Sequence, residues 1–133
     1  IWNASRFVLI QIPKLPRLEL LRIHFNSLTS ADKKIIKALD KAVKSVNKDS
    51  GDYQFGRACH TLYDFFWHDF CDIYIEASKK QEGEQTKKIL LYVLLTSLKL
   101  LHPFIPFITE EIYQKLPIKD KKKALMIEKW PTQ

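Results

Sequence analysis

Apolar residues recur along most of this chain at intervals of three and four positions, which is the period of an α-helix. Pro13 and Pro16 are expected to end the first helix, because proline interrupts helical hydrogen bonding. Residues 17–28 fit a short helix and a loop equally well. We therefore predict an all-α fold, a helical bundle of about four to five helices. The predicted helices cover residues 1–12, 29–48, 53–80, 84–101 and about 107–116.

The segment from residue 29 to residue 48 separates polar from apolar positions most sharply. Thr29 and Asp32 have the spacing of a capping box, which predicts the start of a helix there. With about 100° of rotation per residue, a row of lysines falls within about one quarter of the helix circumference, opposite the apolar residues. Contact with RNA and simple solvation explain this row equally well. We call it the lysine ridge: Lys33, Lys37, Lys41, Lys44 and Lys48.

The next helix, residues 53–80, carries two rows of bulky side chains. A polar turn at residues 47–51 is expected to precede it, with Asp52 as its N-cap. Two such rows are typical of a helix at the centre of a bundle. Packing in the core is therefore preferred over stacking on bases for most of the rings. The inner row is Phe55, Cys59, Leu62, Phe66, Phe70, Ile73 and Ala77, and the second row is Tyr63, Trp67 and Tyr74.

Two acidic residues, Asp69 and Glu76, lie at the edge of these rows, where a carboxylate needs a partner. Arg6 or Arg57 is expected to supply it in a structural ion pair. A pair of carboxylates for acid–base chemistry is the alternative, but the sequence gives no sign of a cleft around them.

The C-terminal third begins with a turn around Gly83 and the helix over residues 84–101. Pro103 and Pro106 then interrupt the chain, and a short helix is expected from about Phe107 to Leu116. After it we expect an exposed basic linker at residues 119–123 and a short extended tail from Leu125 to Trp130. We therefore divide the chain into a helical domain, residues 1–117, and a basic linker with a tail, residues 118–133.

The composition fits one basic globular domain. The 133 residues are 46% hydrophobic and 28% charged, with a formal net charge of +7. This balance favours a polyanionic partner, RNA or DNA before an acidic protein or a membrane. No apolar run is long enough to cross a bilayer, so no membrane contact is expected. The chain opens on Ile1 within a helical pattern, which we interpret as a monomeric fragment of a longer protein.

Catalytic and metal-binding patterns are not recognisable. Three scattered glycines cannot form a phosphate loop. Cys59 is expected to face the core and so not to converge with His60, His68 and Cys71 on a metal. No catalytic residue, metal or cofactor is therefore assigned to this chain. Helical geometry places Cys59 and Cys71 about 18 Å apart, too far for a disulfide, and unpaired thiols fit a cytoplasmic protein.

Three motifs resemble the anticodon-binding domain of class I aminoacyl-tRNA synthetases, in the group that acts on valine, leucine, isoleucine and methionine. They are WNASRFVL at residues 2–9, LYDFFWHDFCDIYIE at residues 62–76 and LLHPFIPFITEEI at residues 100–112. Ala31, Asp32 and Lys33 resemble the start of the family's second helix. Together these segments span nearly the whole chain in the family's order, and the first is most similar to the valyl enzymes.

This resemblance implies a helical bundle that holds the anticodon stem-loop of a tRNA and packs against the catalytic domain of its own parent enzyme. The parent joins its amino acid to tRNA with ATP and Mg²⁺. Lysines neutralise RNA phosphates, and asparagine and arginine can hydrogen-bond base edges. We accordingly predict the tRNA-binding residues Asn3, Arg6, Lys33, Lys34, Lys37 and Lys41.

One position departs from the family pattern. The family often has an aromatic residue after Ala-Asp-Lys, and here it is Lys34, which replaces stacking with a charge. Three alternatives stay open: the anticodon domain of an isoleucyl or leucyl enzyme, a helical protein-interaction module that never touches RNA, and a small helical enzyme with His68, Asp69 and Asp72 in its site.

Overall fold

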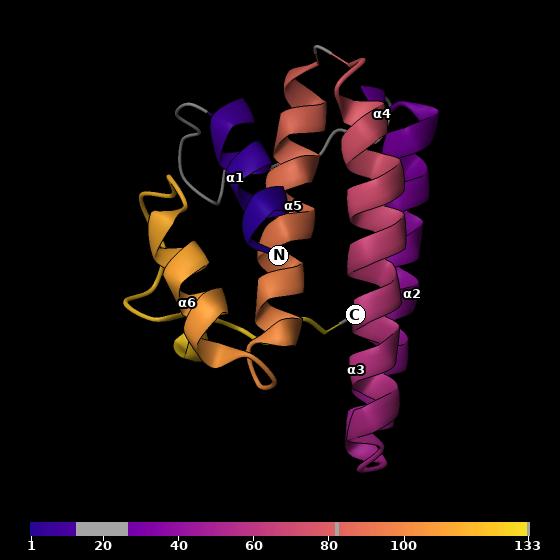
Figure 1. Ribbon diagram of the computed structural model, residues 1–133, viewed down its shortest axis with the longest axis vertical. Helices are drawn as coiled ribbons and strands as arrows, with labels where there is room; N and C mark the ends of the chain where they lie inside the picture. The colour runs from indigo at the N-terminus through magenta and orange to yellow at the C-terminus, as the bar shows by residue number, and fades with distance from the viewer. Residues whose placement is uncertain (13–26, 82, 133) are drawn as a thin grey trace.

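The protein is built of helices packed roughly along one direction (Figure 1). The computed structural model describes residues 1–12, 27–81 and 83–132, and no strand occurs within these ranges. The predicted all-α bundle is therefore confirmed. The predicted stop at Pro13 and Pro16 and the undecided segment up to residue 26 lie outside the described residues. The elements are α1 (Trp2–Gln11), α2 (Ser30–Gly51), α3 (Phe55–Asp64), the π-helix η3 (Phe65–Ile75), α4 (Glu76–Ser78), α5 (Glu84–Leu101), α6 (Pro106–Lys115) and the 3-10 turn η4 (Leu125–Ile127).

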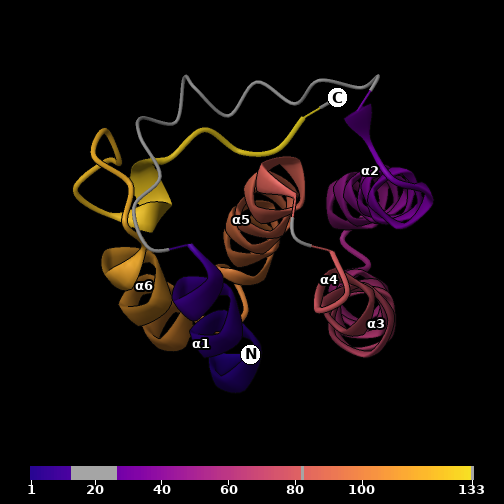
Figure 2. The same cartoon turned by 90° about the horizontal axis from the view of Figure 1, so that it is seen from above.

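Helix α5 is the central element of the bundle. Seen from above, it lies between the pair formed by α2 and α3 on one side and the pair formed by α1 and α6 on the other (Figure 2). Its residues are buried almost all the way round, including Ile89, Leu94 and Leu98, which are fully buried. A helix that is apolar on all sides must be enclosed by others. The helix over residues 53–80, which the sequence placed at the centre, instead forms an outer wall with α2.

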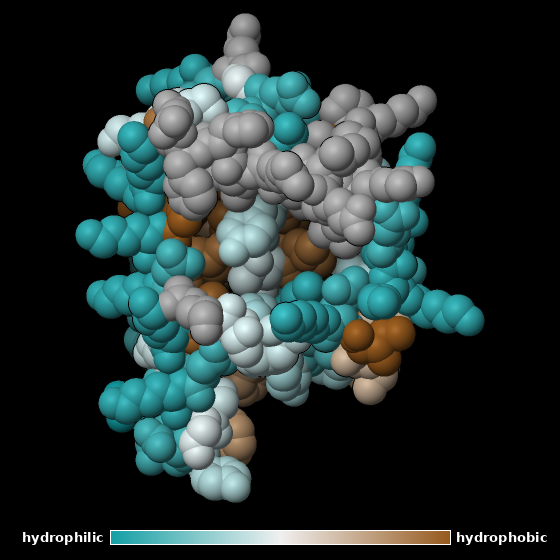
Figure 3. All heavy atoms as spheres, turned by 180° about the vertical axis from the view of Figure 1, so that it is seen from behind, coloured by the Kyte–Doolittle hydropathy of each residue, from teal (hydrophilic) through white to brown (hydrophobic). Residues whose placement is uncertain are grey.

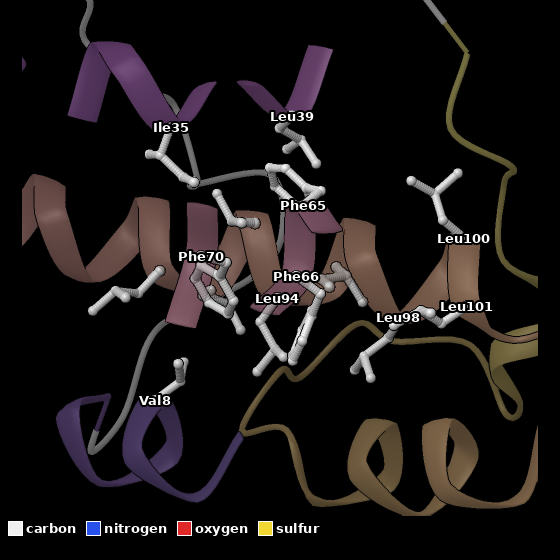
Figure 4. Packing of buried hydrophobic residues seen from close by; sticks show 14 of the residues in the cluster. Val8, Ile35, Leu39, Phe65, Phe66, Phe70, Leu94, Leu98, Leu100 and Leu101 are labelled. Atoms are coloured by element: carbon white, nitrogen blue, oxygen red, sulfur yellow. The ribbon is translucent and has the colours of Figure 1, made fainter. Parts of the chain in front are cut away.

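The core gathers between α5 and the other helices. Figure 4 shows Phe65, Phe66 and Phe70 of η3 close to leucines of α5, with Ile35 and Leu39 reaching the same region from α2 and Val8 from α1. The rings of Phe66 and Phe70 lie 5.4 Å apart between centroids. Burial of such large apolar side chains is worth about 1.5–3 kcal/mol each relative to exposure, so this cluster holds the layers together.

The capping box at the start of α2 is confirmed. The Thr29 side chain accepts a hydrogen bond from the Asp32 N–H at 3.1 Å, and the Asp32 carboxylate accepts one from the Thr29 N–H at 3.0 Å. Asp32 is fully buried. Its other oxygen accepts a hydrogen bond from the Tyr74 hydroxyl at 2.7 Å. Burial, together with this carboxylate, raises the pKa of Tyr74 far above its usual value, so the hydroxyl stays a donor.

The expected turn at residues 47–51 is wrong, because α2 continues to Gly51. Asp49 near its end is buried, accepts a hydrogen bond from Ser45 and pairs with Arg57 at 3.7 Å, which ties the last turn to α3. Asp52 is the C-cap of α2 and not the N-cap of the next helix. The reversal falls at residues 52–54, where Tyr53 adopts a φ of 58°.

The predicted face of the third helix is partly wrong. Leu62, Phe66 and Phe70 are buried as expected, but Ile73 is 63% exposed. The sequence prediction used the α-helical period, whereas η3 has i to i+5 hydrogen bonding and therefore a different register. Phe55, the first residue of α3, is exposed near the tip of the α2–α3 hairpin, which extends beyond α5 (Figure 1), and Cys59 one turn later is also exposed. The residues that η3 buries are Phe65, Phe66, Phe70, Tyr74 and Ile75.

Helices α5 and α6 follow the sequence prediction closely, but the segment after them is more ordered than a linker. Leu125 is buried in the turn η4. The chain then crosses α5 to reach α2 (Figure 2), where Trp130 donates to the Asn47 side chain at 2.7 Å. Residues 118–132, here called the tail, thus pack on the bundle. The division of the chain at residue 117 stays a prediction.

Glu128 attaches the tail to two helices. Its carboxylate accepts hydrogen bonds from the Tyr113 hydroxyl at 2.6 Å and the Lys122 N–H at 3.2 Å, and it pairs with Lys99 of α5 at 3.1 Å. Burial alone would raise the pKa of Glu128, but these three partners outweigh it and lower the pKa below its ordinary value. Because the folded pKa is depressed, the contribution to stability is present above the unfolded pKa and is lost as pH falls through the folded pKa.

We therefore expect Glu128→Gln to lower the free energy of unfolding by about 1–3 kcal/mol at pH 7. The difference from wild type should shrink as pH falls below 4, because protonation removes the same charge. Urea denaturation of both proteins at pH 7 and below pH 4 measures this difference in the free energy of unfolding. Glu111→Gln is the matched control, because its pair with Lys115 is exposed and is worth less than about 1 kcal/mol. A pH-independent difference would contradict the role given to the charge.

Candidate nucleic-acid interface

The lysine ridge is exposed along α2. All five lysines face outward, and the opposite side of the helix buries Ile35, Leu39 and Val46 in the core. Figure 3 shows hydrophilic side chains in a row along the edge that α2 forms, on the left in that view. Within the described part of the chain, none of these lysines forms an ion pair. The ridge is therefore a line of positive charge on one helix, with Asp40 at the border of the concavity that its lysines line.

The structure brings most of the predicted lysines together. Lys34, Lys37, Lys41 and Lys44 surround one shallow concavity on the outer face of α2. Lys33 is exposed in the first turn of the same helix. The capping box fixes where this turn begins, so the positions of Lys33 and Lys34 follow from Thr29 and Asp32. Such an arrangement suits the neutralisation of successive phosphates along an RNA backbone.

Asn3 and Arg6 lie elsewhere. Both are exposed on α1, which packs against α5 and α6 through Val8. Helices α1 and α2 are on opposite sides of α5 (Figure 2). Phe7, next to Arg6, is half-buried beneath the Lys79 ammonium, which lies 5.6 Å from its ring centroid. The predicted residues therefore form two groups, one on α1 and one on α2.

The expected ion pairs of Asp69 and Glu76 are wrong. Among the residues that the structure describes, Arg6 does not pair with Asp69. Glu76 pairs with Lys79. Arg57 binds Asp49. The reason is again the π-helical register of η3, which turns Asp69 toward α2 and away from α1. Arg6 is consequently left exposed on α1.

The histidines and cysteines of α3 and η3 lie mainly on the surface. Cys59 is exposed, whereas the sequence placed it toward the core. His60 contacts Asp64 at 2.9 Å, and His68 contacts Asp72 at 3.4 Å. Among the residues that the structure describes, no group of three or more histidine, cysteine or acidic side chains is arranged to hold a metal. Asp69 faces α2, so it does not share one site with His68 and Asp72.

None of the helices in the described ranges combines the length and apolar character needed to cross a bilayer.

An exposed apolar surface was missed by the sequence analysis. Tyr63 and Trp67 are 59% and 49% exposed, and their rings stack in parallel with centroids 6.0 Å apart. Core packing was expected for most rings of this helix, and Tyr63 and Trp67 are two that do not follow it. They border a hollow of about 270 Å³ whose lining includes no charged residue. The i, i+4 spacing of Cys59, Tyr63 and Trp67 on one helical face was the available signal. We call this surface the aromatic face: Ile1, Cys59, Tyr63, Trp67, Phe104 and Ile105.

A basic ridge on a capped helix, carried by an all-helical bundle, defines a nucleic-acid-binding domain more readily than an enzyme. Comparison with known proteins agrees: the family described as the anticodon-binding domain of tRNA ligase matches residues 32–133. The chain belongs to this family. The matched range begins at Asp32, within the first turn of α2, and excludes α1.

The similar proteins narrow the family to one kind of tRNA ligase. The chain is 44% identical to the valine–tRNA ligase of Thermotoga maritima over 98% of its length, and 42% identical to that of Bacillus cereus over 99%. It is 40% identical to the valine–tRNA ligase of Petrotoga mobilis over 98%. The chain spans 15% of the length of each of these relatives. It therefore corresponds to their anticodon-binding domain.

The geometry of the ridge leads to a prediction about salt. Lys37→Ala and Lys41→Ala should each weaken binding to any stem-loop RNA, whatever its loop sequence. Each should also reduce the slope of log affinity against log salt concentration by about one, because one phosphate contact is lost. Fluorescence titration at several salt concentrations measures both quantities.

Lys123→Ala is the control for these variants. Lys123 is exposed in the tail after α6 and lies outside the concavity of α2. It should leave the salt slope unchanged. If Lys37→Ala and Lys41→Ala also leave the slope unchanged, the ridge is a solvated surface with no part in binding.

Proposed function

We propose that this chain is the anticodon-binding domain of a valine–tRNA ligase and holds the anticodon stem-loop of its tRNA against α2. The observation that carries the proposal is the lysine ridge on a capped, rigid helix inside a domain of this family. In the proposed parent, a separate catalytic domain joins valine to tRNA with ATP and Mg²⁺. This domain takes no cofactor of its own, and we infer that it acts as part of a monomeric cytoplasmic enzyme.

The two groups of predicted residues divide the work of binding. Lysine is a flexible point charge, so the ridge contributes affinity with little choice of sequence. The unpaired bases of an anticodon loop expose rings and edges that a planar guanidinium can stack on and hydrogen-bond. Arg6 is exposed and does not pair with Asp69, so its guanidinium is accessible to a base. Asn3 stands one turn before it on α1 and offers both a donor and an acceptor.

Stem-loop titration tests this assignment. Wild-type protein should bind a valine anticodon stem-loop more tightly than those of isoleucine or leucine. Arg6→Ala should weaken the valine complex by about 1–3 kcal/mol, the range for a well-placed arginine–base contact. Its thermal melt by circular dichroism should not change, because Arg6 is exposed.

Arg6→Lys is the matched variant because it keeps the charge and removes the planar group. We expect it to recover only the salt-dependent part of the loss. Full recovery would mean that Arg6 contacts a phosphate and not a base. Unchanged affinity in Arg6→Ala would remove Arg6 from the site, and tighter binding of the isoleucine or leucine loop would assign the chain to a sister enzyme.

We further propose that the aromatic face packs against the remainder of the parent enzyme. Contiguous apolar surface of this kind marks an interface in a soluble protein. Its lining includes no cation that would neutralise RNA phosphates. The valine–tRNA ligases that the chain resembles are much longer than it is, since the match spans 15% of each. A further domain of the same polypeptide is therefore the occupant that the face fits best.

Cys59 reports on this contact, because it is exposed and borders the hollow. In the full-length ligase, maleimide should alkylate Cys59 at least about tenfold more slowly than in the 133-residue chain, since a covered thiol is inert. Mass spectrometry of the peptides measures both rates. Cys71 is the internal control: it is half-buried on η3 and should react at one rate in both proteins. Equal rates of Cys59 alkylation in the two proteins would reject the proposal. If alkylation of Cys59 slows only after tRNA is added, the face contacts RNA.

A further inference from the structure

A groove with an isolated carboxylate runs between α2 and η3, along the inner side of the lysine ridge. It consists of two adjoining hollows, of about 420 Å³ and 270 Å³, which share Ala38 and Asp69. Lys34 borders the larger hollow and Lys41 the smaller one. Asp69 thus lies in the middle, with Lys34 at one side and Lys41 of the lysine ridge at the other. We call this the Asp69 groove.

The shape of the groove follows from the π-helix. The i to i+5 register turns Asp69 and Ile73 toward α2. The α-helical register that the sequence predicted would instead place Ile73 in the core. Across from them α2 presents Ala31 and Ala38, which are too small to fill the space. Ile73 is left 63% exposed. The larger hollow therefore has apolar walls and one acidic side chain, and its volume is in the range of small-ligand pockets.

The carboxylate has no partner among the residues that the structure describes. No hydrogen bond or ion pair joins Asp69 to another described residue, although the ridge lysines are near. On a surface that attracts phosphates, an acidic group repels the RNA backbone and lowers affinity for every RNA alike. That cost is offset only when the bound RNA donates hydrogen bonds to the carboxylate. The Watson–Crick edge of an unpaired base supplies such donors, and an exocyclic amino group supplies them without an adjacent carbonyl in its place.

We propose that Asp69 is a specificity residue that accepts hydrogen bonds from the exocyclic amino group of one unpaired base in the larger hollow. The ring of that base lies against Ile73 and Ile35, and its neighbouring phosphates lie near Lys34 and Lys41. Guanine, cytosine and adenine carry the amino group. Uracil presents a carbonyl oxygen in its place and has one N3–H donor between two carbonyls, and the carboxylate repels those oxygens. This inference rests on the proposed binding of an anticodon loop.

Asp69→Asn and Asp72→Asn form a matched pair of variants for the test. Both remove one negative charge from η3 with little change of size. Asp72 is exposed, contacts His68 at 3.4 Å and borders neither hollow. Each variant is titrated with a series of stem-loops in which one loop position at a time carries an amino-bearing base or uracil. Thermal melts of the variants check that the fold is kept.

At one loop position, wild-type protein should prefer the amino-bearing base over uracil by about tenfold. Asp69→Asn should reduce this preference to less than about twofold, mainly by binding the uracil loop more tightly, because the amide can also donate to a carbonyl. Asp72→Asn should raise the affinity of every loop by one common factor and leave the preference unchanged.

Three results would overturn the inference in different ways. If Asp69→Asn behaves like Asp72→Asn, Asp69 acts only as a charge. If it changes no affinity at all, the groove is not in contact with RNA, and a protein segment is the occupant to look for. If wild-type protein binds no stem-loop, the proposed function falls together with this inference, whereas in the first two results it stands.

A second measurement needs no variant. Carbodiimide coupling of an amine to the Asp69 carboxylate should be suppressed by the amino-bearing stem-loop and much less by its uracil counterpart. Coupling at Asp72 in the same sample should respond to both loops alike. Equal protection of Asp69 by the two loops would contradict a hydrogen bond from the base.

Discussion

The buried carboxylate of Asp32 determines where the binding surface lies. One of its oxygens closes the capping box with Thr29, and the other accepts the Tyr74 hydroxyl from η3 at 2.7 Å. Thr29 also accepts a hydrogen bond from Gln81, just after α4, at 3.1 Å. A buried carboxylate is costly without such partners, so the first turn of α2 and the π-helix hold each other in one arrangement. Lys33 and Lys34 follow Asp32 directly, and the Asp69 groove lies between the same two elements.

The π-helix also determines which side chains of the third helix are buried and which are exposed. By changing the period of the third helix, it places Tyr74 and Phe70 inside and leaves Ile73 and Trp67 outside. It also turns Asp69 from α1 toward α2, which leaves Arg6 exposed on α1 and puts an acidic group beside the lysine ridge. One irregular segment therefore shapes the groove and contributes Trp67 to the aromatic face.

The sequence predicted those features that depend on residues close together in the chain. The capping box of Thr29 and Asp32, the lysine ridge and the limits of α5 all follow from spacing within a single helix, and each is confirmed. The exposure of Ile73, the direction of Asp69 and the packing of the tail on Asn47 were not predictable in this way. They depend on a change of helical type and on contacts between distant segments, such as the bond from Trp130 to Asn47. The family motif at residues 62–76 identified the domain, but a motif does not state which of its side chains are buried.

A domain that holds one tRNA among many needs more than attraction. In the proposed function the lysine ridge neutralises phosphates that every tRNA carries, so its lysines raise affinity for right and wrong partners equally. Selectivity comes from groups that make the wrong partner worse, since specificity is a difference between two affinities. An unpaired carboxylate inside a basic surface has this property, because its repulsion acts on all RNA and is relieved only by a base that donates to it. In the proposed interface, the lysines determine how tightly any RNA is held, and Asp69 determines which loop is preferred.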